Sequence, residues 1–202
     1  RGTQYIVSLY NSFVYPCTNR SNMSASAKEE LGRRIMEVAY KRGDFILSSG
    51  KKSDYIFDKY AFETQPGLLE DITSYMAEMV PPGTKRLAGM EIGAVPLATA
   101  LSINTGLPFV IIRKVAKGHG ITRQIEGHLS RGDEVLLVED VVTTGRQSVH
   151  GVEILRSAGA VVNNVICVID REEGGRERIE SEGLVFNALF TKGTLMAYKY
   201  HI

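Results

Sequence analysis

Two adjacent carboxylates followed by a small, hydroxyl-rich turn have the clearest chemical potential in this sequence. Glu139 and Asp140 follow the apolar run LLV, and the turn TTGRQS, residues 143–148, leads into a segment with helical spacing. Small residues let backbone amides approach an anion, hydroxyls add donors, and a helix N-terminus contributes positive potential. The turn therefore predicts a phosphate-binding site. The carboxylates before it would repel phosphate, but they suit ribose hydroxyls or a magnesium ion bound through water.

The turn has neither the Walker pattern G-x-x-x-x-G-K-[ST] nor the dinucleotide pattern G-x-G-x-x-G. The alternative is an ordinary helix cap with exposed acids. A second segment, RKVAKGHG (residues 113–120), gathers the basic side chains of Arg113, Lys114, Lys117 and His119, and its glycines, Gly118 and Gly120, would permit a mobile lid. Taken alone, that segment could equally be a solvated basic loop.

Composition limits where such a site can lie. The chain has 202 residues and 44% hydrophobic residues, which suits one domain with a sizeable core. Its 24 basic and 23 acidic residues give a net charge of +1, so no global field recruits nucleic acid or an anionic membrane. No apolar stretch approaches the roughly 18 residues of a membrane span. Cys17 and Cys167 form no metal or redox motif, and we expect a buried thiol at Cys167 in a soluble, cytoplasmic protein.

The first 22 residues differ from the rest, because they contain no Asp or Glu and precede Met23. We interpret residues 1–22 as an extension, disordered or non-native, with a targeting segment as the second interpretation. Residues 23–202 are expected to form a single domain.

Strands and helices alternate along this domain. Ser26 and Glu29 form a capping box for a first helix that Gly43 would stop, and a second helix begins at Pro66. Further helices are expected over about 96–102 and 146–158. The intervening apolar runs are RLAGM, LPFVIIR, EVLLV, VVNNVICVI and LVFNALF. Nearly continuous Val, Ile and Leu between helices predict an α/β fold with a central parallel sheet covered on both faces.

The segment VLLVEDVVTTG is similar to the phosphoribosyl pyrophosphate (PRPP) motif of the type I phosphoribosyltransferases. Five segments, in order and spacing, resemble the orotate phosphoribosyltransferases within that family; they are FILSSGKKSDYIFD, GMEIGAVPLATALS, IIRKVAKGHG, QIEGHLSRGDEVLLVEDVVTTG and VIDREEGGRE. The resemblance covers about residues 24–195. It implies the type I phosphoribosyltransferase fold with a small N-terminal hood formed mainly by about residues 24–65.

The resemblance also implies the reaction. Enzymes of this family transfer the phosphoribosyl group of PRPP to orotate and release diphosphate, in pyrimidine biosynthesis. Magnesium is the implied cofactor, held mainly through PRPP and water, with no direct protein ligand. The basic segment is implied to reach the neighbouring subunit's site, so a homodimer with shared active sites is expected. No nucleic-acid or membrane partner is expected.

Residue roles carry over position by position. The catalytic positions are Lys117, His119 and Asp140, and the orotate positions are Thr143 and Arg171, since an arginine fork matches a carboxylate. Phe57 is either a neighbour of the pyrimidine ring or a core residue. The PRPP positions are Arg113, Lys114, Lys117, His119, Glu139, Asp140, Val141, Val142, Thr143, Thr144, Gly145, Arg146 and Gln147.

Two departures from the family pattern concern the donor substrate. Ser48 stands where some relatives have a lysine, and Ile92-Gly93 stand where others have Tyr-Lys. Backbone amides at that segment would then bind diphosphate without a lysine. Two other functions remain open: a type I transferase for another base, such as a purine, and a non-catalytic PRPP-sensing regulator. The basic segment and both acids argue against the regulator.

Overall fold

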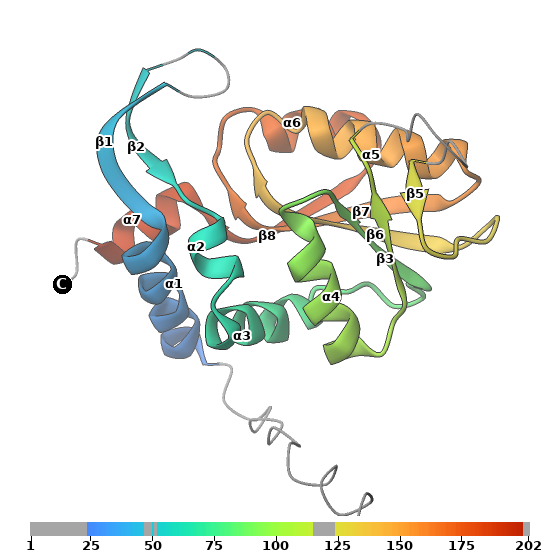
Figure 1. Cartoon of the computed structure of the whole chain (residues 1–202), viewed down its shortest axis with the longest axis horizontal. Coiled ribbons are helices and arrows are strands. Elements are labelled where there is room, and N and C mark those ends of the chain that lie inside the picture. Colours follow the sequence, from blue (N-terminus) through green and yellow to red (C-terminus); the bar gives the residue numbers. More distant parts are fainter. Residues whose placement is uncertain (1–23, 47–49, 51, 115–123, 200–202) are drawn as a thin grey trace, which may run out of the picture.

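The computed structural model describes residues 24–46, 50, 52–114 and 124–199. Within these ranges the chain forms a six-stranded sheet with helices on both faces and a separate two-stranded sheet (Figure 1). The hairpin rises beside the large sheet, above the first and last helices. The expected α/β architecture with a small N-terminal unit is therefore confirmed.

The large sheet has the strand order β5-β4-β3-β6-β7-β8. Every described pairing in it is parallel except that of β5 with β4. Each predicted apolar run overlaps one strand, and RLAGM matches its strand in full. The bounds are β3 Arg86–Met90, β4 Phe109–Ile112, β5 Ile125–Glu126, β6 Glu134–Val142, β7 Val161–Asp170 and β8 Val185–Thr191.

Two hydrophobic clusters cover the two faces of this sheet. Side chains alternate between faces along a strand, so Leu136 packs in one cluster and Leu137 in the other. The first cluster joins the sheet to α1 (Ala25–Ala39), α2 (Tyr60–Glu63), α3 (Pro66–Ala77), α4 (Ala94–Thr105) and α7 (Lys192–Lys199). The second joins it to α5 (Arg146–Ser157) and α6 (Gly175–Ser181). Figure 1 shows these two groups of helices on opposite sides of the sheet.

The first helix differs from its prediction at both ends. Ser24, not Ser26, caps it by accepting a hydrogen bond from the amide of Ala27 at 3.2 Å. The helix ends at Ala39, and Gly43 lies inside a strand rather than at the helix stop. The chain turns directly into β1 (Tyr40–Ile46), which pairs antiparallel with β2 (Lys52–Phe57). This hairpin forms the observed hood.

Strand β6 corrects the expected position of the acids. The prediction placed Glu139 and Asp140 after the buried strand, but β6 continues to Val142 and both residues are only 5% exposed. Pairing with β7 continues as far as Val142 and Asp170, which keeps the strand extended beyond the acids. The two carboxyl groups are therefore held by a rigid strand rather than by a loop.

No helix among the described residues is long and apolar enough to cross a membrane. Cys167, in β7, is fully buried as expected, and burial raises the pKa of its thiol well above the ordinary value. The thiol is therefore protonated and unreactive at neutral pH.

Phe62, in α2, is a fully buried member of the first core cluster, with an exposed fraction of 0%. We expect Phe62→Ala to destabilise the fold by about 3–5 kcal/mol, the usual cost of emptying a buried aromatic site. Urea unfolding would measure it. Val185→Ala, at a site 55% exposed in β8, is the control and should cost less than about 0.5 kcal/mol. Equal losses for both variants would contradict the assigned core.

Candidate active site

A cavity of about 890 Å³ opens where β6 and β7 end. In parallel α/β sheets, ligands bind beyond the carboxyl ends of the strands, so this position fits a substrate site. The cavity brings together nine of the residues predicted from sequence. They are Glu139, Val141, Val142, Thr143, Thr144, Gly145, Arg146, Gln147 and Arg171.

The turn from β6 into α5 has the geometry of an anion site. Gly145 precedes the first helical residue with a φ of 69°, a left-handed conformation that glycine adopts without strain. A Cβ on Gly145 would lie 2.8 Å from the carbonyl oxygen of Gly175, so a larger residue would also clash. Gly145 offers no side-chain cap to the first turn of α5. The amides of that turn remain suited to a phosphate at the helix N-terminus.

The two acids of β6 face different neighbours. Glu139 accepts a hydrogen bond from the Ser148 hydroxyl, at 3.0 Å, and lines the large cavity. Asp140 accepts a hydrogen bond from the ammonium group of Lys59 at 2.6 Å. The amide of Val141 donates to the other oxygen of Asp140. The strand thus presents one carboxyl group to a helix and the other to the segment that follows the hood.

Burial changes the protonation of the cluster formed by Lys59, Glu63, Glu139 and Asp140. Desolvation, and then the charge of Asp140, raise the pKa of Glu139 to about 8. The same two causes raise the pKa of Glu63 to about 8, and both of its carboxyl oxygens are buried with no partner among the described atoms. For Lys59, burial lowers the pKa, but the charge and hydrogen bond of Asp140 outweigh it and the net shift is upward. At neutral pH the cluster therefore holds one lysine cation, with Glu63 and Glu139 mainly protonated.

Arg171 provides the cationic end of the large cavity. It follows β7, and its amide donates to the carbonyl of Val142 at 2.9 Å, which ties it to the phosphate-binding turn. Its guanidinium pairs with Glu173 at 2.9 Å and lies 5.8 Å from the ring centre of Tyr55 in the hood. Its buried Nε atom has no partner among the described atoms. A carboxylate-bearing ligand could pair with this arginine at the cavity wall that it shares with Tyr55.

The hood contributes Tyr55 rather than Phe57 to this cavity. Phe57 packs against Tyr40 and Tyr55 and against the first core cluster. Of its two sequence interpretations, the structure supports the core residue.

A smaller cavity, about 270 Å³, lies on the other side of Glu139. It shares Glu139 and Gln147 with the large cavity, so the two form neighbouring compartments. Its remaining lining is Lys59, Tyr60, Met90, Glu91, Ile92, Gly93, Lys114 and Asp140.

The basic segment is only partly described. Lys114 lines the smaller cavity, and its amide donates to the Glu91 carboxylate at 2.7 Å. Arg113 lines neither cavity in the described structure and lies 3.6 Å from Glu126. Lys117 and His119 lie outside the described residues.

Sequence reasoning missed Lys59, Glu63 and Tyr55. Lys59 is 81 positions from Asp140, and Glu63 ends a helix of four residues, so no local spacing relates either to the acids of β6. Tyr55 lies two residues before Phe57 in β2 and therefore on the same face of the strand, and this spacing offered the only sequence signal.

Within the described ranges, no group of three His, Cys, Asp or Glu side chains is arranged to hold a metal ion. The residues fit a magnesium ion that receives most of its ligands from a phosphorylated substrate and water. Two carboxyl groups, Glu139 and Asp140, lie close enough to the cavities to accept hydrogen bonds from its water ligands.

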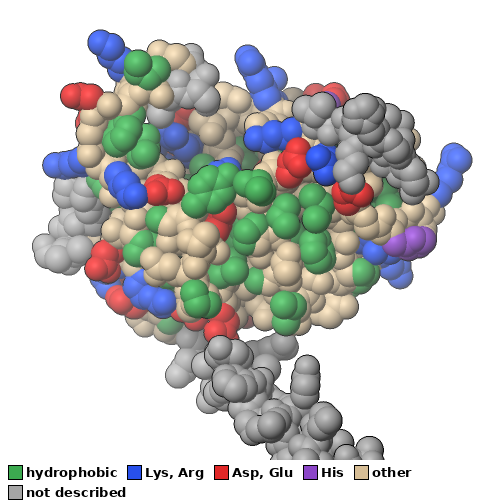
Figure 2. Space-filling view, in the orientation of Figure 1, with side chains coloured by type: hydrophobic (Ala, Val, Ile, Leu, Met, Phe, Trp, Pro, Cys, Tyr) green, Lys and Arg blue, Asp and Glu red, His purple; other side chains and the backbone are tan. Residues whose placement is uncertain are grey.

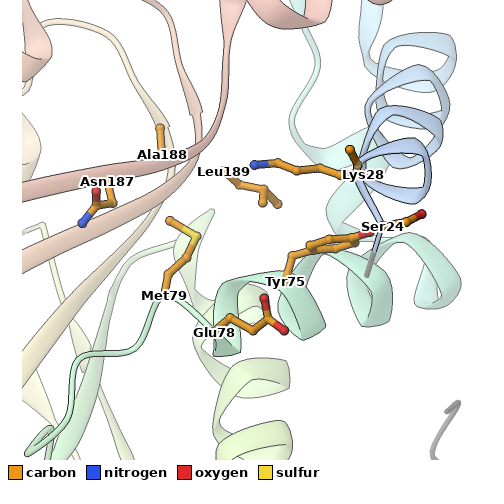
Figure 3. A pocket seen from close by; sticks show the side chains of 9 residues that line it. Ser24, Lys28, Tyr75, Glu78, Met79, Asn187, Ala188 and Leu189 are labelled. Carbon is orange, nitrogen blue, oxygen red and sulfur yellow. The ribbon is translucent and has the colours of Figure 1, made fainter. Parts of the chain in front are cut away.

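A third cavity, about 580 Å³, lies between α1, α3 and β8 (Figure 3). Figure 3 shows Lys28 reaching from α1 toward β8, where its ammonium group lies 5.5 Å from the centre of the Phe190 ring. None of the residues predicted to bind substrate lines this cavity. The chemistry of the site therefore lies at the carboxyl ends of β6 and β7.

This strand order, with a phosphate-binding turn after β6, is that of a phosphoribosyltransferase. The family model described as "Phosphoribosyl transferase domain" matches residues 62–198, and the chain belongs to this family. Within the family it is one of the orotate phosphoribosyltransferases. A curated protein of that name from Methanocella arvoryzae is 50% identical over 161 residues, which is 80% of this chain and 92% of the relative.

Solved structures agree with this assignment. The orotate phosphoribosyltransferase of Mycobacterium tuberculosis, in complex with Fe(III) dicitrate, matches with a TM-score of 0.75 and 33% identity, over 83% of this chain and 98% of that one. A structure of the same enzyme in complex with PRPP matches with a TM-score of 0.72 and 29% identity, over 84% and 98% of the two chains.

The raised pKa of Glu63 makes stability depend on pH. The folded state keeps this proton up to about pH 8, whereas the unfolded chain releases it near the ordinary value of 4.5. The stabilising effect of the bound proton is therefore complete below about 4.5 and is lost as the pH rises to about 8. We expect Glu63→Gln to reduce this loss by up to about 1.4 kcal/mol per pH unit.

Urea unfolding of both proteins at several pH values between about 5 and 8 measures the effect. Glu70→Gln, at an exposed position of α3, is the matched control and should leave the pH profile unchanged. Parallel profiles for Glu63→Gln and the wild type would contradict the protonated state of Glu63.

Proposed function

We propose that the protein catalyses the transfer of the phosphoribosyl group from PRPP to orotate, giving orotidine 5'-monophosphate and diphosphate. The observation that carries this proposal is the large cavity. It joins a phosphate-binding helix N-terminus, the strand carboxyl group of Glu139 and an arginine beside an aromatic ring. Membership of the orotate phosphoribosyltransferase family and the PRPP complex of the Mycobacterium tuberculosis relative support it.

Each compartment suits one part of the substrates. The amides and hydroxyls of the turn 143–147 suit the 5-phosphate, and the carboxyl groups of Glu139 and Asp140 suit the ribose hydroxyls. Arg171 suits the orotate carboxylate, with Thr143 in the same cavity wall and Tyr55 against the ring. The diphosphate would then lie in the smaller cavity. This arrangement places the anomeric carbon between the base and the leaving group, as a direct displacement requires.

Charge is the catalytic problem in this reaction. The departing diphosphate gains negative charge while the ribose ring becomes cationic, so groups that respond to these charges stabilise the transition state more than the ground state. Lys117 and His119 are assigned to the diphosphate through the family resemblance, and Lys114 lines the smaller cavity. Asp140, charged and fixed by β6, would stabilise the cationic ribose. Bound magnesium would neutralise the diphosphate.

A homodimer with shared active sites is part of the proposal. Helix α4 is apolar on its outer side as well as its inner side: Ile103 is 79% exposed, and nearby Ile92 and Tyr60 are 66% and 46% exposed. Figure 2 shows hydrophobic side chains gathered over this helix. Because Ile92 and Tyr60 also line the smaller cavity, a second copy seated here would bring its basic segment to the diphosphate. A cytoplasmic location and a role in making UMP belong to the same proposal.

Turnover of orotate is the direct test. Purified protein with PRPP, magnesium and orotate should consume orotate, followed by its ultraviolet absorbance, while hypoxanthine, adenine and uracil should give no product. Excess EDTA should abolish the reaction, and added magnesium should restore it. Asp140→Asn should reduce kcat at least about 100-fold, because it removes the charge facing the ribose. Turnover of a purine in place of orotate would overturn the substrate assignment.

Mixed dimers test the shared site. Lys117→Ala and Asp140→Asn place their defects on the two chains of each proposed site, so mixing them with subunit exchange should restore about a quarter of wild-type activity. Half of the randomly paired dimers would be mixed, and each would hold one intact site. Arg171→Ala mixed with Asp140→Asn is the control, because both defects lie in the same chain's part of each site, and it should show no rescue. Absence of rescue in the first mixture, with subunit exchange demonstrated, would contradict shared sites.

A further inference from the structure

Lys59 lines the smaller cavity, and it lies just after Asp58, the last residue of the hood segment that resembles the family. It lies between β2 and α2, and its ammonium group contacts Asp140 Oδ2 at 2.6 Å. The side chain remains 33% exposed, whereas that of Asp140 is 6% exposed. One side of the ammonium group therefore pairs with a buried carboxylate, while part of the side chain remains open to solvent at the cavity wall.

The absence of a side chain at Gly93 leaves room for this lysine. The segment Glu91-Ile92-Gly93 lines the cavity without a basic side chain. A Cβ on Gly93 would lie 1.7 Å from Asp140 Oδ2 and 2.6 Å from Lys59 Nζ. The ammonium group thus occupies the space that a side chain at position 93 would need. Lys59, from the segment after the hood, thus provides the cation that Glu91-Ile92-Gly93 does not.

Two lysines in the cavity wall could contact an anionic ligand. Lys59 and Lys114 contribute two cations to the lining. Glu91 already accepts a hydrogen bond from the Lys114 amide, and the raised pKa of Glu139 keeps it mainly protonated. Of the two other acids in the lining, Glu91 and Asp140, it is Asp140 that pairs with Lys59. A ligand that brings its own negative charge, and ribose hydroxyls for Asp140, would satisfy both members of the pair.

We propose that Lys59 binds the diphosphate group of the donor substrate, exchanging its ion pair with Asp140 for contacts to the phosphate oxygens as Asp140 turns to the ribose hydroxyls. This inference rests on the proposed function for the identity of the donor. The exchange leaves neither group without a hydrogen-bond partner, because phosphate oxygens replace Asp140 at Lys59 and ribose hydroxyls donate to Asp140 in place of the ammonium group.

Binding measurements with two sugars separate this role from a structural one. PRPP and ribose 5-phosphate share the sugar and the 5-phosphate, but only PRPP carries the diphosphate. Lys59→Met removes the charge at similar length, and Lys59→Gln keeps a hydrogen-bond donor for Asp140. Titration calorimetry with magnesium should show PRPP and free diphosphate binding weakened about 10- to 100-fold in both variants. Ribose 5-phosphate binding should change less than about threefold.

Lys41→Met is the matched control. Lys41 forms a similar pair with Asp58, at 2.7 Å, but it lies in the hood outside both cavities. This variant should bind all three ligands as the wild type does. Thermal unfolding of the three variants would establish that each is folded before titration. If Lys59→Met is not folded, Lys59→Gln alone provides the test.

Two results would overturn the proposal: unchanged PRPP binding in the folded Lys59 variants, or equal weakening of PRPP and ribose 5-phosphate. Equal weakening would mean that Lys59 acts only by positioning Asp140. Failure of the proposed function is distinguishable, because a wild-type protein that binds PRPP but does not consume orotate would overturn the acceptor alone. A wild-type protein that binds neither sugar phosphate would overturn both.

Discussion

The contact between the Lys59 ammonium group and the Asp140 carboxylate is the constraint on which the site depends. Asp140 is nearly buried in a central strand, and an unpaired charge there would cost several kcal/mol. Its partner, Lys59, lies in the segment that follows the hood, so the ion pair joins that segment to the central sheet. Gly93 has no side chain because the pair already fills that space. One ion pair therefore constrains three segments that are far apart in the sequence, those that contain Lys59, Gly93 and Asp140.

Protonation makes this concentration of acids tolerable. Glu63, Glu139 and Asp140 lie in one cluster with Lys59, and three negative charges there would oppose both folding and the binding of a phosphorylated ligand. The raised pKa values of Glu63 and Glu139 remove two of those charges near neutrality. The remaining charge, on Asp140, is the one that Lys59 balances. Burying these acids contributes little to stability. It creates a site whose protonation would change when a charged ligand binds.

The sequence predicted the parts of this structure that depend on local pattern. Continuous apolar runs identified the parallel strands, Pro66 marked a helix start, and the turn at Gly145 indicated an anion site because its chemistry lies within six residues. The acids of β6 were misplaced because carboxylates are rare in a buried strand, and the burial is compensated only by distant partners. Lys59 could not be predicted, since its pairing with Asp140 is set by tertiary folding. Ser24 replaced Ser26 as the helix cap because two serines at neighbouring positions compete for one role.

The division into two cavities separates two electrostatic tasks. The 5-phosphate keeps its charge throughout the proposed reaction, so rigid amides at the start of α5 bind it equally before and during the chemical step. The diphosphate gains charge as it leaves, and the cavity assigned to it is lined by lysine side chains, which can move toward that charge. Glu139 and Gln147 stand at the boundary between the compartments, where the ribose would lie. Binding energy from the large cavity can thus hold the sugar in place, while the lysines of the smaller cavity stabilise the developing charge of the diphosphate.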